Sequence, residues 1–184
     1  MTREAPRRRV LLLTQNLDVW GAQRQIVELA RGLVRAEYDV RLGALEPMGT
    51  LVEDVERLGI PMHAFPRRWR WDLSPIRDLA RYLRREHIDV VHSFLFLPNF
   101  YARLAGKLAA TPAVVSSLRS TGIEGAPRYA LDIATCALCD ALIANSQAGA
   151  DHYVRRGGLR GRIAVVRNGF TPRPLPPPSA LEPP

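Results

Sequence analysis

Five short hydrophobic runs that each stop at polar residues constrain the fold of this chain most. They span residues 10–13, 88–91, 113–115, 141–143 and 163–166. Runs of Val, Ile and Leu without alternation are typical of parallel strands that are buried on both faces. Ligands bind such sheets outside the carboxyl ends of the strands. We therefore expect the polar residues that follow the runs to gather at the edge of the sheet that carries the chemistry.

Helical patterns separate these runs and two further strand patterns. The predicted helices span residues 22–35, 51–58, 74–86, 98–110, 128–139 and 146–156, and the further strands span residues 38–44 and 60–65. Ser74 is the expected N-cap of the third helix, with Pro75 in its first turn. The alternation predicts an α/β fold, a Rossmann-like doubly wound parallel sheet of about seven strands. In the common strand order 3-2-1-4-5, the first and fourth strands are neighbours.

The chain divides into three parts by composition. Residues 1–8 form a basic extension, residues 9–170 hold the whole strand and helix pattern, and residues 171–184 form a linker or tail in which seven of fourteen residues are proline. Such a proline-rich segment favours an extended spacer. A length of 184 residues suits one domain with a substantial core. We therefore expect one domain that is half of something larger.

The chain is basic, with a net charge of +8 and Lys107 as its only lysine. This balance favours anionic partners, such as phosphorylated substrates or an acidic membrane surface, although a GC-rich genome produces the same arginine bias. The arginines are scattered and match no nucleic-acid-binding motif, so nucleic acid is not an expected partner. The apolar run after the basic start is too short for a signal peptide or a membrane span. The expected location is the cytoplasm.

The two cysteines give little information about function. Cys136 and Cys139 lie three residues apart in an apolar helical pattern. That spacing puts both on one helix face, which favours two buried thiols over a redox pair. A zinc site would need two more ligands at suitable spacing, and the sequence shows none. We expect no metal site.

Two predicted loops meet where the first and fourth strands end. The first loop contains Asn16 and Gly21, and a glycine directly before a helix lets an anion approach the helix N-terminus. The second loop begins at His92, which can hydrogen-bond a sugar hydroxyl or move a proton near pH 7. The alternatives are a plain turn glycine and a structural histidine. The sequence has no dinucleotide-binding or P-loop fingerprint.

Two groups of arginine also stand out. Arg119 follows the fifth strand at the same predicted edge, and its guanidinium suits phosphate or carboxylate, with a solvated loop arginine as the alternative. The second group lies in the loop after the third strand and reads Arg67, Arg68, Trp69, Arg70 and Trp71. Arginine interleaved with tryptophan suits an anionic membrane interface. In the alternative interpretation, the tryptophans pack on the domain while the arginines stay solvated.

Five segments, in this order, resemble the amino-terminal half of a GT-B glycosyltransferase, close to the family-4 group that makes cell-wall and surface glycans. They read W-G-A-Q-R at residues 20–24, D-V-V-H-S at 89–93, V-V-S-S-L-R at 114–119, A-L-I-A-N-S at 141–146 and V-V-R-N-G at 165–169. The resemblance implies an acceptor-binding half, with a second half that binds the nucleotide-sugar. It also implies hexosyl transfer with retained anomeric configuration, without metal and without a cofactor beyond the nucleotide-sugar co-substrate.

The resemblance also implies roles for particular residues. Gly21, Ala22 and Arg24 would approach the phosphates of the donor, and His92 would be the catalytic residue near the transferred sugar. Asn168 and Gly169 would form the hinge before the crossing to the second half. The positions that would contact the acceptor or line the cleft are Asn16, Ser93, Asn99, Arg119, Asn145 and Ser146.

The chain departs from the family pattern in three respects. The family usually has two glycines where this chain has Trp20 and Gly21, and further histidines where Phe94 and Leu97 stand. The donor half, with its basic residue and paired glutamates, is missing, so we expect no turnover by this chain alone. Two alternatives remain open. One is a stand-alone module for a glycan or lipid-linked precursor, or a subunit of a split transferase. The other is half of a nucleotide-sugar epimerase.

Overall fold

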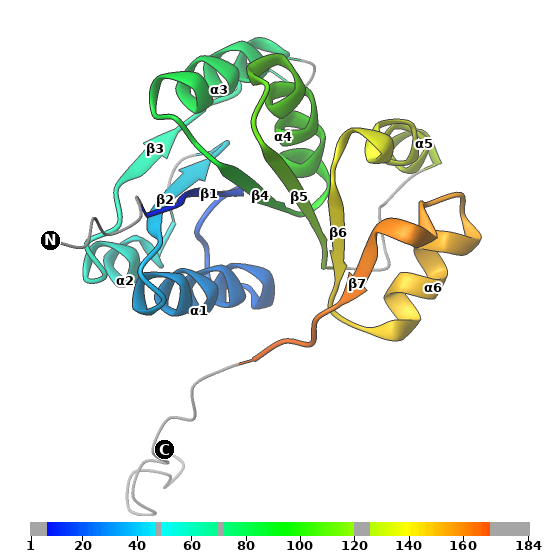
Figure 1. Ribbon diagram of the computed structural model, residues 1–184, viewed down its shortest axis with the longest axis horizontal. Coiled ribbons are helices and arrows are strands. Elements are labelled where there is room, and N and C mark those ends of the chain that lie inside the picture. Colours follow the sequence, from blue (N-terminus) through cyan, green and yellow to red (C-terminus); the bar gives the residue numbers. More distant parts are fainter. Residues whose placement is uncertain (1–6, 47–48, 70–71, 120–125, 170–184) are drawn as a thin grey trace, which may run out of the picture.

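The computed structural model describes residues 7–46, 49–69, 72–119 and 126–169, and it shows one sheet with helices on both sides (Figure 1). The strands are β1 (Arg9–Thr14), β2 (Asp39–Ala44), β3 (Met62–Ala64), β4 (Val90–Phe94), β5 (Ala113–Leu118), β6 (Ala141–Ala144) and β7 (Ile163–Val165). The helices are α1 (Gly21–Arg35), α2 (Val52–Glu56), α3 (Ser74–Arg85), α4 (Phe96–Ala109), α5 (Ala126–Thr135) and α6 (Gln147–Arg155), with short 3-10 turns at Cys136–Leu138 and Arg160–Arg162.

The seven strands run parallel in the order β3-β2-β1-β4-β5-β6-β7, which confirms the predicted α/β class and the position of β1 beside β4. Leu12 of β1 is paired with Leu42 of β2 and with His92 of β4. This register brings the carboxyl ends of β1 and β4 to one edge of the sheet. Because the chain order reverses between these two strands, that edge is the topological switch point of the fold.

Each face of the sheet has its own hydrophobic core. Leu12, Leu42 and Phe94 point to the side that α1 and α2 cover, together with Ile26 of α1 and Val55 of α2. The alternate strand residues point to the side covered by α3, α4 and α5. This two-sided burial explains why the strands appear in the sequence as continuous apolar runs.

Two strands extend further than the sequence suggests. The predicted fourth strand stops before His92, but β4 runs from Val90 to Phe94. The predicted fifth strand stops at Val115, but β5 continues to Leu118, and Phe94 is paired with Ser117. The prediction that these polar residues begin loops is therefore wrong. Polar residues remain within the ladder here because their side chains find hydrogen-bond partners in the interior.

The start of α3 also differs from the prediction. Ser74 is the first helical residue, and Leu73 occupies the N-cap position without a side-chain cap. The carboxylate of Asp72 instead accepts hydrogen bonds from the amides of Ser74 and Arg68, both at 2.8 Å. These bonds hold the pKa of Asp72 below its usual value. Ser146, predicted as the first residue of its helix, is instead the N-cap of α6, since its hydroxyl accepts a hydrogen bond from the amide of Gly149 at 3.1 Å.

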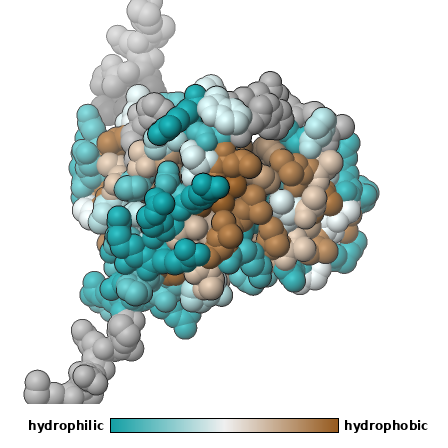
Figure 2. All heavy atoms as spheres, turned by 90° about the horizontal axis from the view of Figure 1, so that it is seen from above, coloured by the Kyte–Doolittle hydropathy of each residue, from teal (hydrophilic) through white to brown (hydrophobic). Residues whose placement is uncertain are grey.

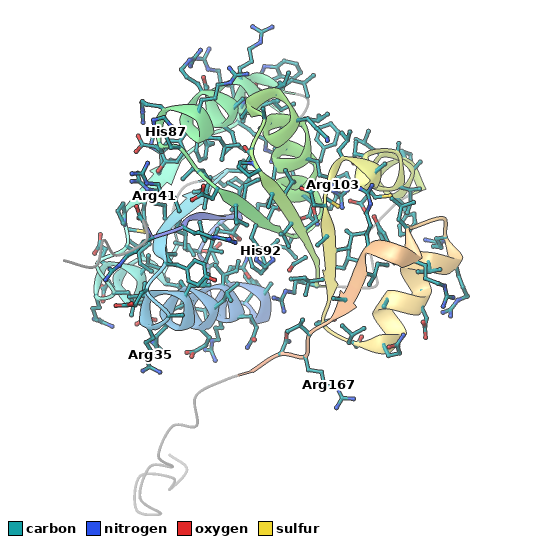
Figure 3. The ribbon with its side chains drawn as sticks, viewed as in Figure 1. Arg35, Arg41, His87, His92, Arg103 and Arg167 are labelled. Carbon is teal, nitrogen blue, oxygen red and sulfur yellow. The ribbon has the colours of Figure 1, made fainter. Side chains whose placement is uncertain are left out.

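A buried ionic cluster joins α4, α5 and α6. Nη1 of Arg103 lies 2.8 Å from a carboxylate oxygen of Asp132, and neither side chain is exposed. The hydroxyl of Tyr153 donates to the other carboxylate oxygen at 2.6 Å, and Nε of Arg103 donates to Ser116 on β5. Burial alone would lower the pKa of Arg103, but the charge of Asp132 keeps it raised. The arginine therefore stays charged between the helices (Figure 3).

Cys136 and Cys139 are buried free thiols, as predicted, but they do not share a face of α5, because α5 ends at Thr135 and Cys139 follows the 3-10 turn with extended backbone. Burial raises the pKa of Cys139, so its sulfur stays protonated and inert. In the described part of the chain, no helix has the length and apolar character needed to cross a membrane.

Candidate functional site

A cavity of about 330 Å³ lies on the α1 side of the sheet. It lies between α1, the strands and the segment that follows β7. The residues that line it are Gln25, Glu28 and Leu29 of α1, His92 and Ile143 of the strands, Arg119 after β5, and Val166, Arg167 and Gly169 after β7. We call it the α1-side cavity.

His92 forms part of the floor of this cavity (Figure 3). Its side chain is 9% exposed, its Nε2 lies 2.8 Å from the hydroxyl of Ser117, and its ring stacks on Phe94 at 4.3 Å. Burial, and then the charge of Arg119, lower the pKa of His92 to about 3. The imidazole is therefore neutral at pH 7. It can accept or donate a hydrogen bond, but the expected titration near pH 7 is wrong for this environment.

Arg119 lines the same cavity as His92. Its guanidinium lies 5.1 Å from the centre of the Phe94 ring, and its Nη1 donates to the side-chain oxygen of Asn168 at 2.6 Å. Its Nε is buried and has no hydrogen-bond partner among the described residues. Burial lowers the pKa of Arg119, yet arginine remains protonated at neutral pH. A charged guanidinium that lines a cavity is suited to an anionic ligand oxygen.

Of the two predicted hinge residues, Gly169 lines the cavity, and Asn168 contacts the lining residue Arg119. Asn168 accepts the hydrogen bond from Arg119, and the amide of Gly169 donates to Gln25 of α1 at 3.1 Å. The exit segment is thus attached both to α1 and to the loop after β5. Arg167, beside them, points its side chain away from the sheet (Figure 3).

The loop between β1 and α1 lies outside the cavity lining. Gly21 is the first residue of α1, and a Cβ placed on it would meet no atom within 4 Å. Asn16 contacts Asp18 and accepts a hydrogen bond from Gln23 at 3.0 Å. The first turn of α1 has no acidic residue, so its free amides can face an anion. Gly21, Ala22 and Arg24 therefore lie at the start of α1, apart from the α1-side cavity.

Trp20 occupies the position before Gly21 where the family pattern has another glycine. Its φ of −123° and ψ of 165° are extended backbone angles that any residue adopts. The substitution therefore costs no backbone strain. Its side chain is 69% exposed, so an aromatic ring stands at the switch-point edge of the sheet.

Ser93 and Asn99 are buried on the α4 side of the sheet. The hydroxyl of Ser93 donates to the side-chain oxygen of Asn99 at 2.8 Å, and the side-chain amide nitrogen of Asn99 donates to the backbone carbonyl of Ser117 at 3.1 Å. Asn99 and Arg119 line a second, small cavity of about 20 Å³. Of the other predicted acceptor positions, Asn145 directly follows β6, and the hydroxyl of Ser146 is engaged in the cap of α6.

The arginine and tryptophan loop after β3 is described only as far as residue 69. Arg67 pairs with Glu46 at 2.8 Å, and Trp69 is 60% exposed. Arg70 and Trp71 lie outside the described residues. The exposed Trp69 contradicts the alternative in which this ring packs on the domain.

Three cavity residues of α1 were not predicted from the sequence. Gln25, Glu28 and Leu29 follow Gly21 at intervals of four, seven and eight residues, so they share one helix face. The sequence contains that spacing, but the apolar positions of the same helix predict more clearly which face packs on the sheet. Among the described residues, no group of three His, Cys, Asp or Glu side chains could hold a metal ion.

The fold corresponds to the amino-terminal half of a GT-B protein. Residues 19–173 match the sequence profile of glycosyltransferase family 4, and the chain belongs to this family. No curated protein sequence matches the chain significantly.

Solved structures with this fold are distant in sequence. HepE of Anabaena in complex with UDP-glucose is 18% identical with a TM-score of 0.76, and the match covers 88% of this chain and 44% of HepE. The lipopolysaccharide outer core galactosyltransferase WaaB is 13% identical with a TM-score of 0.73, over 95% of this chain and 50% of WaaB. MurG of Acinetobacter baumannii is 12% identical with a TM-score of 0.67, over 90% and 46%. The chain therefore spans about half the length of these structures.

Proposed function

We propose that this domain is the acceptor-binding half of a retaining, nucleotide-sugar-dependent hexosyltransferase of cell-wall or surface glycan synthesis. The observation that carries the proposal is the α1-side cavity, in which a neutral His92 and a charged Arg119 meet. A neutral imidazole suits a sugar hydroxyl, and a guanidinium suits a phosphate or carboxylate of the acceptor. The acceptor would thus combine a glycan or lipid-linked sugar with an anionic group.

The proposed donor is a nucleotide-sugar held by a second half. Support comes from the HepE structures, which contain UDP, UDP with glucose, or UDP-glucose. In this chain, the amides at the start of α1 and the open space around Gly21 are suited to the donor phosphates. The nucleotide-sugar serves as a co-substrate, and we propose no further cofactor.

The test is a substitution that removes the charge of Arg119 from the cavity. It is made in an enzyme that contains this domain together with a donor-binding half. Arg119→Gln should lower kcat/KM for an anionic acceptor by about 10- to 100-fold, the worth of one charge-assisted hydrogen bond. Arg35→Gln is the matched control, because Arg35 is exposed at the end of α1 and does not line the cavity, and it should leave kcat/KM nearly unchanged. Equal losses in both variants would refute the role of Arg119.

A second candidate is half of a nucleotide-sugar epimerase. The fold supports it as well, since a UDP-N-acetylglucosamine 2-epimerase matches with a TM-score of 0.64 at 16% identity. The family membership favours the transferase. Product analysis separates the two, because an epimerase converts the nucleotide-sugar without any acceptor, whereas a transferase releases nucleotide only when an acceptor receives the sugar. A binding module without catalysis would do neither.

We further propose that the protein works in the cytoplasm at the inner face of the membrane. The free thiols of Cys136 and Cys139 suit a reducing compartment. A lipid-linked acceptor would require contact with the bilayer, and the exposed ring of Trp69 is one candidate contact.

A further inference from the structure

The imidazole of His92 is held in one orientation by two contacts. Its ring stacks on Phe94 with 4.3 Å between the ring centres, which fixes the plane of the ring. Its Nε2 lies 2.8 Å from the hydroxyl oxygen of Ser117, which fixes the rotation within that plane. The other ring nitrogen, Nδ1, makes no hydrogen bond with any described residue, and His92 lines the α1-side cavity. Nδ1 is therefore the ring nitrogen that remains for a ligand.

The burial of Ser117 decides the direction of this hydrogen bond. Ser117 is 0% exposed, so water does not reach its hydroxyl. Among the described residues, Nε2 of His92 is the one hydrogen-bond partner of that hydroxyl. If Nε2 carried the proton, the hydroxyl proton of Ser117 would lie in the interior without an acceptor, and a buried donor without an acceptor is destabilising. The hydroxyl therefore donates to Nε2, and the single proton of the neutral ring lies on Nδ1.

Ser117 is itself held from the other face of the sheet. Its backbone carbonyl accepts a hydrogen bond at 3.1 Å from the side-chain nitrogen of Asn99, whose side-chain oxygen accepts one from Ser93. Asn99 is 1% exposed, and α4, which carries it, presents a largely apolar outer surface (Figure 2). Because these bonds are buried, water does not compete for them. They fix β5 at Ser117, and with it the hydroxyl that contacts His92.

The turn before α4 shows how firmly this arrangement is held. Leu95 has a φ of 75° and a ψ of 165°, a conformation that is accessible essentially to glycine alone. Its carbonyl oxygen accepts a hydrogen bond from the backbone amide of Asn99 at 3.0 Å. A leucine persists in such a conformation only where the surrounding contacts hold it there. The turn therefore keeps Asn99 at its place against β5.

We propose that Ser117 is a positioning residue that keeps the proton of His92 on Nδ1, so that the imidazole serves the α1-side cavity as a hydrogen-bond donor and not as a base. A general base needs a free lone pair within reach of the proton that it removes, and the hydroxyl of Ser117 occupies the lone pair of Nε2. Nδ1–H and the guanidinium of Arg119 are then both donors at this cavity. A ligand oxygen that accepts hydrogen bonds fits both. The inference rests on the proposed function for the reaction, whereas the position of the proton does not depend on it.

The first test is a long-range 1H–15N correlation spectrum of the 184-residue chain. A protonated and an unprotonated ring nitrogen give different 15N chemical shifts, and His92→Gln identifies the signal of His92 among the four histidines. In the wild type, Nδ1 should be protonated and Nε2 unprotonated from about pH 5 to 8. Ser117→Ala should remove this preference and mix the two tautomers. A proton on Nε2 in the wild type would overturn the proposal.

The neighbouring serine provides the matched control. Ser116 is equally buried, but it points to the opposite face of β5, where its hydroxyl accepts a hydrogen bond from Arg103. Ser116→Ala should therefore leave the ring signals of His92 unchanged. Ser117→Thr keeps the hydroxyl and should retain the wild-type tautomer. If Ser116→Ala and Ser117→Ala changed the signals of His92 equally, Ser117 would have no special role. The wild-type spectrum decides the position of the proton even if a variant does not fold.

The second test measures sugar transfer in an enzyme that contains this domain together with a donor-binding half. Ser117→Ala should lower kcat/KM by about 5- to 10-fold, the worth of one neutral hydrogen bond, while Ser116→Ala and Ser117→Thr should stay close to the wild type. A pH limb of kcat/KM between about pH 5 and 8 that disappears in His92→Gln would identify a base and overturn the proposal. An enzyme that transfers no sugar would refute the proposed function, whereas the spectrum would still decide the tautomer.

Discussion

The imidazole of His92 stays neutral because its surroundings exclude water and place Arg119 nearby. In the unfolded chain, its pKa returns to about 6.5, so the unfolded state binds more protons below that pH. Stability should therefore fall as the pH falls through 6.5 toward the folded pKa of about 3. We expect a loss of about 1.5 kcal/mol in the free energy of unfolding between pH 6.5 and 5 from this residue.

Urea denaturation at several pH values measures this loss. His92→Gln should flatten the pH dependence in this window, whatever its effect on stability at pH 7. Partial burial of the ring also lowers the pKa of His63. Because His63 as a whole is exposed at the edge strand β3, His63→Gln should flatten the curve less than His92→Gln does. A curve for His92→Gln with the wild-type slope would show that this side chain titrates normally in the folded protein.

The roles of single residues were harder to predict than the strands that carry them. The sequence correctly placed His92 and Arg119 at one site because strand order brings β4 and β5 together. It could not show that β4 continues past His92, since a buried polar residue and a loop residue look alike without their partners. Ser117, which bonds to His92, lies 25 residues away, and only the folded register reveals that contact.

At the scale of elements, the ion pair of Arg103 and Asp132 fixes three helices to one another. Arg103→Met should destabilise the protein by about 3–5 kcal/mol, because it leaves a buried carboxylate without its partner. Adding Asp132→Asn should recover much of that loss, since the amide keeps a partner for Tyr153 without a buried charge. Chemical denaturation of both variants measures the difference. A loss below about 1 kcal/mol for Arg103→Met would show that water replaces the arginine.

The helices themselves were predictable to within a few residues. Their apolar periodicity places one face on the sheet, as Ile76, Leu79 and Leu83 do in α3. Their ends were less certain, because capping depends on which nearby side chain reaches the free amides. At the start of α3, the carboxylate of Asp72 accepts a hydrogen bond from the backbone amide of Ser74, and it also accepts one from the amide of Arg68. Asp72 therefore satisfies the helix end in place of the hydroxyl of Ser74. That choice depends on the path of the preceding loop, which local sequence does not determine.

At the scale of the molecule, we expect the 184-residue chain alone to release no nucleotide from a panel of nucleotide-sugars. In the proposed function a second half holds the nucleotide-sugar, and electrostatic stabilisation of the departing diphosphate is usually the largest catalytic term. Nucleotide release measured with and without acceptor, beside an intact family enzyme as positive control, tests this. Clear turnover by the chain alone would refute it.

The exit segment after β7 links the binding of a ligand in the cavity to the position of the chain that follows Gly169. Gly169 is bonded to α1 and Asn168 to Arg119, and Gly169 and Arg119 line the cavity. Any displacement of the chain beyond Gly169 must therefore reshape the cavity, and any ligand that fills the cavity must resist that displacement by the same free energy. Occupancy of the cavity and the orientation of whatever follows Gly169 are thus thermodynamically linked, with two hydrogen bonds as the coupling element.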